Sequence, residues 1–442
     1  MKLIFKTTLL SMIIAGSVNA QDYATTLEPW NASIQTTSIW QHKPSINGPY
    51  GTYGDNTHSL LPNSESVYSI SVSPTFGLRV WDGGEVYFTP EVFSTKMMSE
   101  MTGFGGFPNG ENQRGGSEKP KFYVAKLFFR QTWNLDGDYT SVASDAGQLA
   151  GSVSSQRIVL TVGQLALPDI FDNNKYSHSP RTQFMNWSLM SGGAYDYAAD
   201  VRGYNQGVTL EYYDYDWVYR IGRFKEPVLP NGLELDLHFL THYGDQIEVE
   251  HAHTIASQTG KVRALVFRNK MEMGSYADAL TLGQTSAAIP DQTLVRKEHT
   301  KYGYVIGFEQ ALSDDIGVFG RYSWCDGQTE MYSFAEIDES LSGGVSIQGE
   351  KWKRKDDTFG IAIALNDLSK NHREYLAQGG LDFVIGDGKI NYHQEQILET
   401  YYSVRINKNI WTSLDYQHII NPAYNSDRGP VNIYGIRLHM EF

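Results

Sequence analysis

The feature that most constrains this chain is an alternation of apolar and polar residues with a period of two. It is clearest at the end of the sequence, where the apolar members are Tyr434, Ile436, Leu438, Met440 and Phe442. Between them stand Gly435, Arg437, His439 and Glu441. In a β-strand, successive side chains point to opposite faces, so one face is apolar and the other is polar. About ten residues of this kind match the length that a tilted strand needs to cross a bilayer.

The same alternation recurs along the chain. It is present in residues 207–213, 216–224, 316–324 and 359–365. Short polar turns join neighbouring segments, as Asp214, Tyr215 and Asp216 do. This arrangement predicts an all-β, antiparallel meander of hairpins. Residues 103–116, 275–293 and 335–349 are predicted to be loops, and 365–381 has a more helical pattern.

The first twenty residues have the pattern of an export signal. Lys2 and Lys6 supply positive charge, an apolar stretch follows at 9–14, and Val18-Asn19-Ala20 places small residues at the cleavage site. We therefore predict a signal peptide at residues 1–20 and one barrel domain at 21–442. The apolar stretch is too short to serve as a membrane-spanning helix, which needs about 20 residues.

The composition fits an exported barrel. Mean hydropathy is −0.38, as expected where lipid-facing and water-facing residues alternate. Aromatic residues make up 13% of the chain, and tyrosine and tryptophan suit the belts where a barrel wall meets lipid headgroups. The single cysteine, Cys325, excludes an intrachain disulfide, so pairing of the backbone must hold the chain. A net charge of −14 argues against nucleic-acid binding, which needs a basic surface.

Several stretches resemble the carbohydrate-selective porin family, which is typified by the glucose-inducible porin of pseudomonads. They are residues 81–91 (WDGGEVYFTPE), 105–110 (GGFPNG), 129–132 (FRQT), the long run 163–232, and 386–402. The resemblance implies a transmembrane antiparallel β-barrel of about 16 strands in the bacterial outer membrane, with loops folded into the channel. It also implies passive diffusion of mono- or small oligosaccharides.

A sugar offers hydroxyl groups for hydrogen bonds and C–H faces for aromatic rings, and its binding in a channel must be weak enough for release. The candidate pore-lining residues are therefore the charged and aromatic residues of the family-like stretches and of neighbouring strands. They are Arg79, Trp81, Glu85, Glu91, Arg130, Asp169, Asp172, Arg202, Glu211 and Arg220. Asp82-Gly83-Gly84 is a turn signal, so Arg79 and Glu85 are expected on the two arms of one hairpin.

Other chemistry finds less support in the sequence. His242, His251 and His253 could suggest a metal site, but no cysteine or carboxylate is spaced to complete one. We predict no metal, no cofactor and no catalytic residue.

Two alternatives stay open. One is an exported soluble carbohydrate-active β-protein, either sugar-binding or a glycosidase using a pair such as Asp169 with Asp172, or Asp196 with Asp200. The other is a general, non-selective porin. The expected partners are small sugars, outer-membrane lipid, and the barrel-assembly machinery acting through the aromatic residue Phe442. The chain is expected to be a monomer or a homotrimer.

Overall fold

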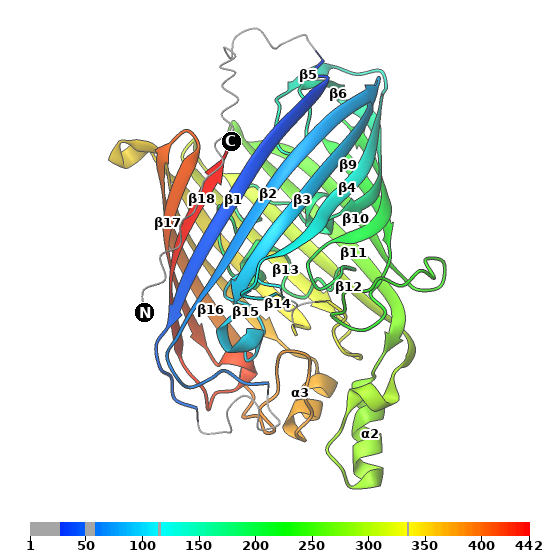
Figure 1. Cartoon of the computed structure of the whole chain (residues 1–442), viewed down its shortest axis with the longest axis vertical. Coiled ribbons are helices and arrows are strands. Elements are labelled where there is room, and N and C mark those ends of the chain that lie inside the picture. Colours follow the sequence, from blue (N-terminus) through cyan, green and yellow to red (C-terminus); the bar gives the residue numbers. More distant parts are fainter. Residues whose placement is uncertain (1–26, 49–57, 114–115, 334–335) are drawn as a thin grey trace.

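A computed structural model describes residues 27–48, 58–113, 116–333 and 336–442. Among these residues, sixteen antiparallel strands close into a barrel (Figure 1). The first strand pairs with the last, with Gln35 opposite Glu441 and His42 opposite Tyr434. This closure satisfies the backbone of every barrel strand from both sides, so the sheet has no free edge. The predicted fold class is confirmed. The predicted signal peptide, residues 1–20, lies outside the described residues.

The strands of the barrel follow one another around the wall in nearly sequential order. They are β1 (Trp30–Lys43), β2 (Glu65–Trp81), β3 (Gly84–Lys96), β4 (Lys121–Asn134), β7 (Gln156–Leu165), β8 (Asn205–Asp214), β9 (Trp217–Phe224), β10 (Tyr243–Ile255), β11 (Gln258–Met273), β12 (Lys297–Ala311), β13 (Ile316–Cys325), β14 (Glu339–Gly349), β15 (Arg354–Asp367), β16 (Glu395–Asn407), β17 (Ile410–Ile420) and β18 (Val431–Glu441). A separate two-stranded sheet consists of β5 (Tyr139–Val142) and β6 (Gly151–Ser154).

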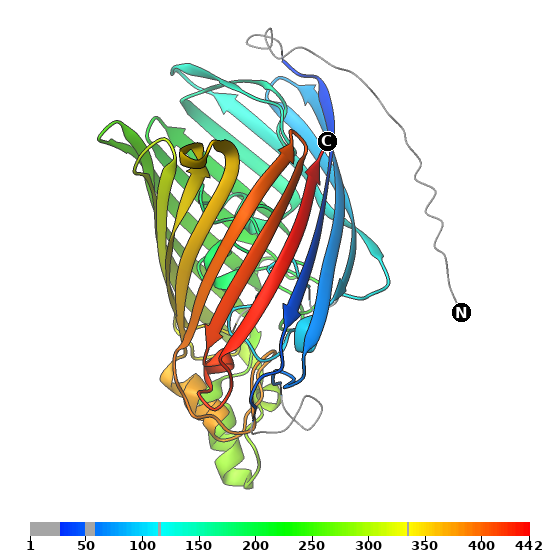
Figure 2. The same cartoon turned by 90° about the vertical axis from the view of Figure 1, so that its left-hand side faces the viewer.

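The two ends of the barrel differ in their connections. At one end, called the turn end, short turns join β2 to β3, β8 to β9 and β16 to β17, and the β5–β6 hairpin lies there too (Figures 1 and 2). At the other, called the loop end, long connections carry α2 (Tyr276–Ser286) and α3 (Lys370–Ala377). Outer-membrane barrels place long loops outside the cell and short turns in the periplasm, so the loop end is the outer end.

The remaining helices are short. The α-helix α1 (Trp187–Met190) lies within the connection from β7 to β8. The 3-10 helices are η1 (Met98–Met101), η2 (Leu167–Asp169), η3 (Gln292–Val295), η4 (Glu350–Trp352) and η5 (Pro422–Tyr424). Within the described part of the chain, no helix is both long and apolar enough to cross a membrane.

Alternating side chains give the wall two different faces. Exposed apolar residues on the outside include Leu210, Val266, Ile306, Ile363 and Ile436. Exposed outward aromatics lie toward the turn end, as Trp30 and Trp217 do, and toward the loop end, as Trp40, Phe122 and Tyr302 do. An apolar band between two aromatic belts is the outer surface that a bilayer requires. The strands predicted from alternation in 207–213, 216–224, 316–324 and 359–365 are confirmed as β8, β9, β13 and β15.

Three of the predicted non-strand segments need correction. The segment 335–349 was expected to be a loop, but it contains β14, whose glycine and serine residues hide the alternation. Only Leu341 and a few neighbours mark its outer face. Segment 275–293 carries the helix α2, which begins after the cap Ser275. Segment 365–381 does contain α3, but its first residues complete strand β15.

Gly83 in the β2–β3 turn offers a test of the turn geometry. Its φ is +70°, and a Cβ there would lie 2.1 Å from the carbonyl oxygen of Thr132. Gly147 has a similar φ of +78°, with nothing within 4 Å of the added carbon. We expect Gly83→Ala to lower the free energy of unfolding by about 2–5 kcal/mol, because left-handed backbone and overpacking both cost energy. Gly147→Ala should cost only about 1–2 kcal/mol. Urea unfolding in lipid vesicles measures both, and equal losses would contradict the steric explanation.

Candidate functional site

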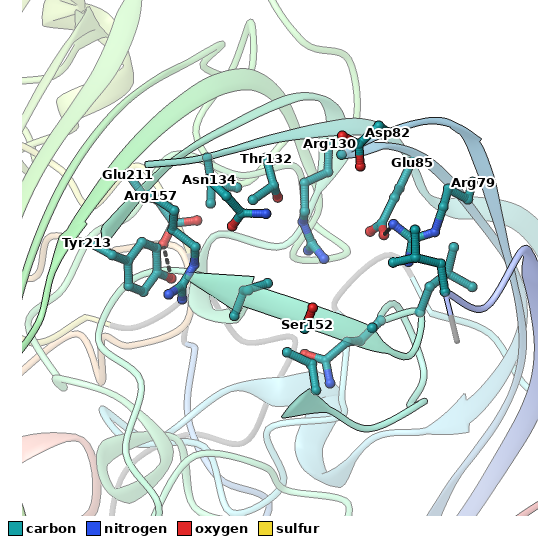
Figure 3. A pocket seen from close by; sticks show the side chains of 18 of the residues that line it. Arg79, Asp82, Glu85, Arg130, Thr132, Asn134, Ser152, Arg157, Glu211 and Tyr213 are labelled. Atoms are coloured by element: carbon teal, nitrogen blue, oxygen red, sulfur yellow. Dashed lines mark hydrogen bonds and ion pairs between the residues drawn. The ribbon is translucent and has the colours of Figure 1, made fainter. Parts of the chain in front are cut away.

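A polar cavity of about 330 Å³ opens in the lumen at the turn end. Strands β2 to β4 and β7 to β9 supply one side, and the β5–β6 hairpin crosses the opposite side (Figure 3). The beginning of the β7–β8 connection contributes Asp169, Ile170 and Asn173. The charged lining residues are Arg79, Asp82, Glu85, Arg130, Arg157, Asp169, Glu211 and Arg220. The volume is within the range of small-molecule sites in proteins.

The hairpin of β2 and β3 presents a charge pair to this cavity. Arg79 and Glu85 are opposite one another in register, and Arg79 Nη1 lies 2.9 Å from Glu85 Oε1, as the turn signal predicted. Arg130 follows on β4, opposite Glu85 in register. Its guanidinium lies 5.2 Å from the ring centroid of Tyr87 and donates to the carbonyl of Gly147 at 3.0 Å. Positive and negative groups therefore alternate along this part of the wall.

Farther along the same wall, Arg220 on β9 is surrounded by carboxylates. It lies 3.0 Å from Glu211, 2.7 Å from Glu248 and 3.2 Å from Glu250. Arg263 extends the series, at 2.8 Å from Glu250 and 3.0 Å from Glu309.

Four members of this charge network were not predicted from the sequence: Glu248, Glu250, Arg263 and Glu309. A period-two search would have found the first two, since Gln246, Glu248 and Glu250 occupy one face of β10.

The connection from β7 to β8, residues 166–204, folds into the barrel and is held there by wall charges. Arg321 on β13 binds Asp172 at 2.9 Å. Arg181 in the connection binds Glu91 on β3 at 3.0 Å and Glu111 at 2.7 Å. These contacts come from opposite sides of the barrel, so the connection crosses the lumen.

A second connection, described over residues 97–113 and 116–120, also enters the lumen. The amides of Gly105 and Gly106 donate to the Glu395 carboxylate at 2.9 and 2.8 Å. Gln41 and Gln417 donate to the carbonyl of Pro108 at 2.8 and 2.7 Å. The family-like stretch 105–110 is thus an inward segment. On the far side of the lumen, strands β14 to β18 and residues 175–183 line a second cavity of about 230 Å³.

The ten predicted residues fall into three groups. Six line the turn-end cavity: Arg79, Glu85, Arg130, Asp169, Glu211 and Arg220. Three lie in or against the inward connection: Glu91, Asp172 and Arg202, whose guanidinium lies 4.5 Å from the ring centroid of Tyr123. Whether any of them contacts a solute stays a prediction.

The tenth residue, Trp81, was predicted to line the pore, but its side chain lies on the outer face of the wall. A register irregularity follows Arg79, so Trp81 pairs with Gly84 rather than continuing the lumen face. Its ring is 58% exposed and packs against Phe129, with centroids 5.4 Å apart. Its indole donates to Gln131 at 2.7 Å. An outward tryptophan at the turn end belongs to the aromatic belt of the wall.

The carboxylates considered for glycoside hydrolysis are engaged in structural contacts. Asp172 binds Arg321, and Asp196 binds Lys301 at 3.2 Å, with both side chains of the second pair fully buried. Asp200 accepts the amide of Arg202 at 2.8 Å. Asp169 binds Lys126 at 2.5 Å. These contacts favour a role in holding the inward connection.

A closed barrel with an apolar outer surface, a charged lumen and inward connections defines an outer-membrane porin. A model of the carbohydrate-selective porin family (OprB family) matches residues 77–442. The chain therefore belongs to this family, and the resemblance inferred from the sequence is confirmed. Its family and fold are those of a channel in the bacterial outer membrane rather than of an enzyme.

Individual relatives are more distant. Porin AaxA of Chlamydia abortus is 21% identical over 304 residues, which is 68% of this chain. The chain spans 58% of the length of that relative. The solved structure of Pseudomonas putida OprB superposes with a TM-score of 0.70 at 13% identity, covering 94% of each chain. That likeness shows the shared fold.

Removing Arg181 tests how the inward connection is held. Arg181→Met leaves the Glu91 carboxylate, 1% exposed, without its cation, and breaking a buried pair costs about 3–5 kcal/mol. We expect a looser connection, seen as raised conductance and current noise in planar bilayers. Lys351→Met, which removes an exposed positive charge outside this connection and outside both cavities, is the control. Identical recordings from both variants would show that Arg181 does not hold the connection.

Proposed function

We propose that this chain lets small carbohydrates diffuse passively across the outer membrane, and that the turn-end cavity is one position on their path. The observation that carries the proposal is the row of alternating charges around that cavity. Arg79, Glu85 and Arg130 lie toward one end of the strand wall of the cavity, and Glu211 lies toward the other end (Figure 3). Arg220 lines the cavity beside Glu211. No chemical step is part of this function.

The charge pairing suits an uncharged, hydroxyl-rich solute. Because Arg79 pairs with Glu85 and Arg220 pairs with Glu211, much of the local charge is neutralised while donors and acceptors stay in place. Charge-assisted hydrogen bonds to a hydroxyl are strong enough to replace lost water contacts. The rings of Tyr87 and Tyr213 lie beside these groups. Weak binding at several such positions permits both uptake and release.

The match to the family model and the chemistry of the lumen support a porin that prefers sugars. The alternative is a general porin without solute preference. Lipid is the partner of the outer face. We also propose that the barrel-assembly machinery binds Phe442, which is 62% exposed beside the end of β18. A single chain or a trimer is compatible with the proposed path, because the cavity lies within one barrel.

Liposome swelling tests the proposal. Vesicles containing the purified protein should swell faster in glucose than in an amino acid of similar size. Arg130→Gln removes a charged donor from the cavity, and losing about 0.5–1.5 kcal/mol of hydrogen bonding corresponds to about a two- to tenfold slower sugar flux. Flux of the amino acid should change less.

Trp81→Phe is the matched control, because it changes a residue at the same end of the barrel but on its outer face. Its swelling rates should equal those of the unaltered protein. Equal swelling in sugar and amino acid would support the general porin. A Trp81→Phe effect as large as that of Arg130→Gln would remove the cavity from the path.

A further inference from the structure

Four ionisable side chains meet in the interior of the loop end, away from the turn-end cavity. Glu336 and Asp338 come from the β13–β14 connection, and His372 and Asp382 come from the β15–β16 connection. Their exposed fractions are 0, 2, 0 and 1%. Helices α2 and α3 lie side by side at this end, and both belong to the surroundings of the cluster (Figure 1).

The imidazole of His372 is fixed at the centre. Nδ1 lies 2.9 Å from Asp338 Oδ2, and Nε2 lies 2.7 Å from Asp382 Oδ2. The ring of Tyr276 stacks on the imidazole, with centroids 4.4 Å apart and an interplanar angle of 19°. Asp338 is itself held by the amide of Ser369, which donates to Oδ2 at 2.8 Å. Each ring nitrogen therefore faces a carboxylate in a defined orientation.

The cluster has more negative groups than its one imidazole can balance. Glu336 Oε2 is buried and accepts no hydrogen bond from the described residues, while Oε1 accepts the amide of Phe383 at 3.2 Å. The buried lysine Lys301 is paired with Asp196 at 3.2 Å. A buried carboxylate oxygen without a partner is costly, so something else is expected to satisfy it.

A divalent cation at this position would give Glu336 Oε2 a partner and would supply the missing positive charge.

We propose that Glu336, Asp382 and His372 Nε2 bind one divalent transition-metal ion of the Zn²⁺ type. One ligand atom from each of these residues lies within 4.8 Å of the others. One imidazole nitrogen with carboxylate oxygens is a donor set that Zn²⁺ takes, whereas Ca²⁺ prefers oxygen ligands alone. Asp338 acts as a positioning residue, because a carboxylate on the second ring nitrogen orients a metal-bound histidine.

The ion would join three connections of the loop end. Glu336 and Asp338 belong to the first, and His372 and Asp382 belong to the second. The third, between β11 and β12, joins through Tyr276 and Gln292, which donate to Asp382 at 2.8 and 2.5 Å. This role is separate from the proposed sugar path, so the two proposals stand or fall independently.

A second group of potential ligands must be separated from this site. Asp236, His238 and His242 also lie within reach of one another, and both histidines approach Asp236 at 2.6 Å through Nδ1. The His238 side chain is 77% exposed, so this group is open to solvent. The test therefore starts from the full chain carrying His238→Ala and His242→Ala.

Folded protein with this background is stripped with a chelator and titrated with Zn²⁺. We expect one equivalent to bind and to raise the unfolding temperature, because a ligand that binds only the folded state stabilises it. Glu336→Gln and Asp338→Asn should each weaken binding by about 10–100-fold. Asp278→Asn, which changes an exposed carboxylate of α2, should bind as the background does.

Absence of Zn²⁺ binding by the background protein would overturn the proposal and leave an ion pair held by protons. Equal binding by Glu336→Gln would overturn it as well. Retention of Ca²⁺ in place of Zn²⁺ would overturn the transition-metal assignment. If Glu336→Gln does not fold, Asp338→Asn tests the proposal instead. This variant keeps all three ligands but should still bind Zn²⁺ more weakly, and unchanged binding would overturn the proposal.

Discussion

The rest of this structure depends on one constraint, the need to pair every backbone amide and carbonyl that meets lipid. Lipid offers no hydrogen bonds, so strands can cross it only as a closed cylinder. The pairing of β1 with β18 meets that need. Closure also determines which kind of side chain faces each way, because each strand must present apolar residues to lipid and polar residues to the lumen. A barrel of this size is also too wide for wall side chains to fill, so its interior is open to water and to inward connections.

The backbone amides and carbonyls of the inward connections also need hydrogen-bond partners inside the lumen. Their amides and carbonyls cannot form a ladder with the wall, so side chains of the wall pair with them instead. Glu248 accepts the amide of Asp172 at 2.7 Å, and Glu395 accepts the amides of Gly105 and Gly106. Buried carboxylates remain charged only where such donors or cations surround them. The abundance of acidic residues on the inner face therefore has a structural cause.

The sequence was sufficient to predict the fold, because strand alternation is a local signal that closure demands. It was insufficient where small residues conceal the alternation, as in β14, and where a register irregularity turns a side chain outward, as at Trp81. Most of the charged residues of the turn-end cavity were predicted because they belong to, or lie beside, the stretches that resemble the family. The contact of Arg321 with Asp172 joins residues 149 positions apart, and no local period encodes a contact across the lumen.

Position along a strand decides what a wall charge can do. Glu85 and Glu91 share the inner face of β3, separated along the strand by about 20 Å at a rise of 3.3 Å per residue. Glu85 opens onto the turn-end cavity, whereas Glu91 is buried under Arg181 of the inward connection. Two chemically identical residues therefore have different roles: the one covered by the connection forms a structural ion pair, and the one left uncovered faces the cavity. We therefore expect solute preference to depend on the charges that the inward connections leave uncovered, and so on loops as much as on the wall.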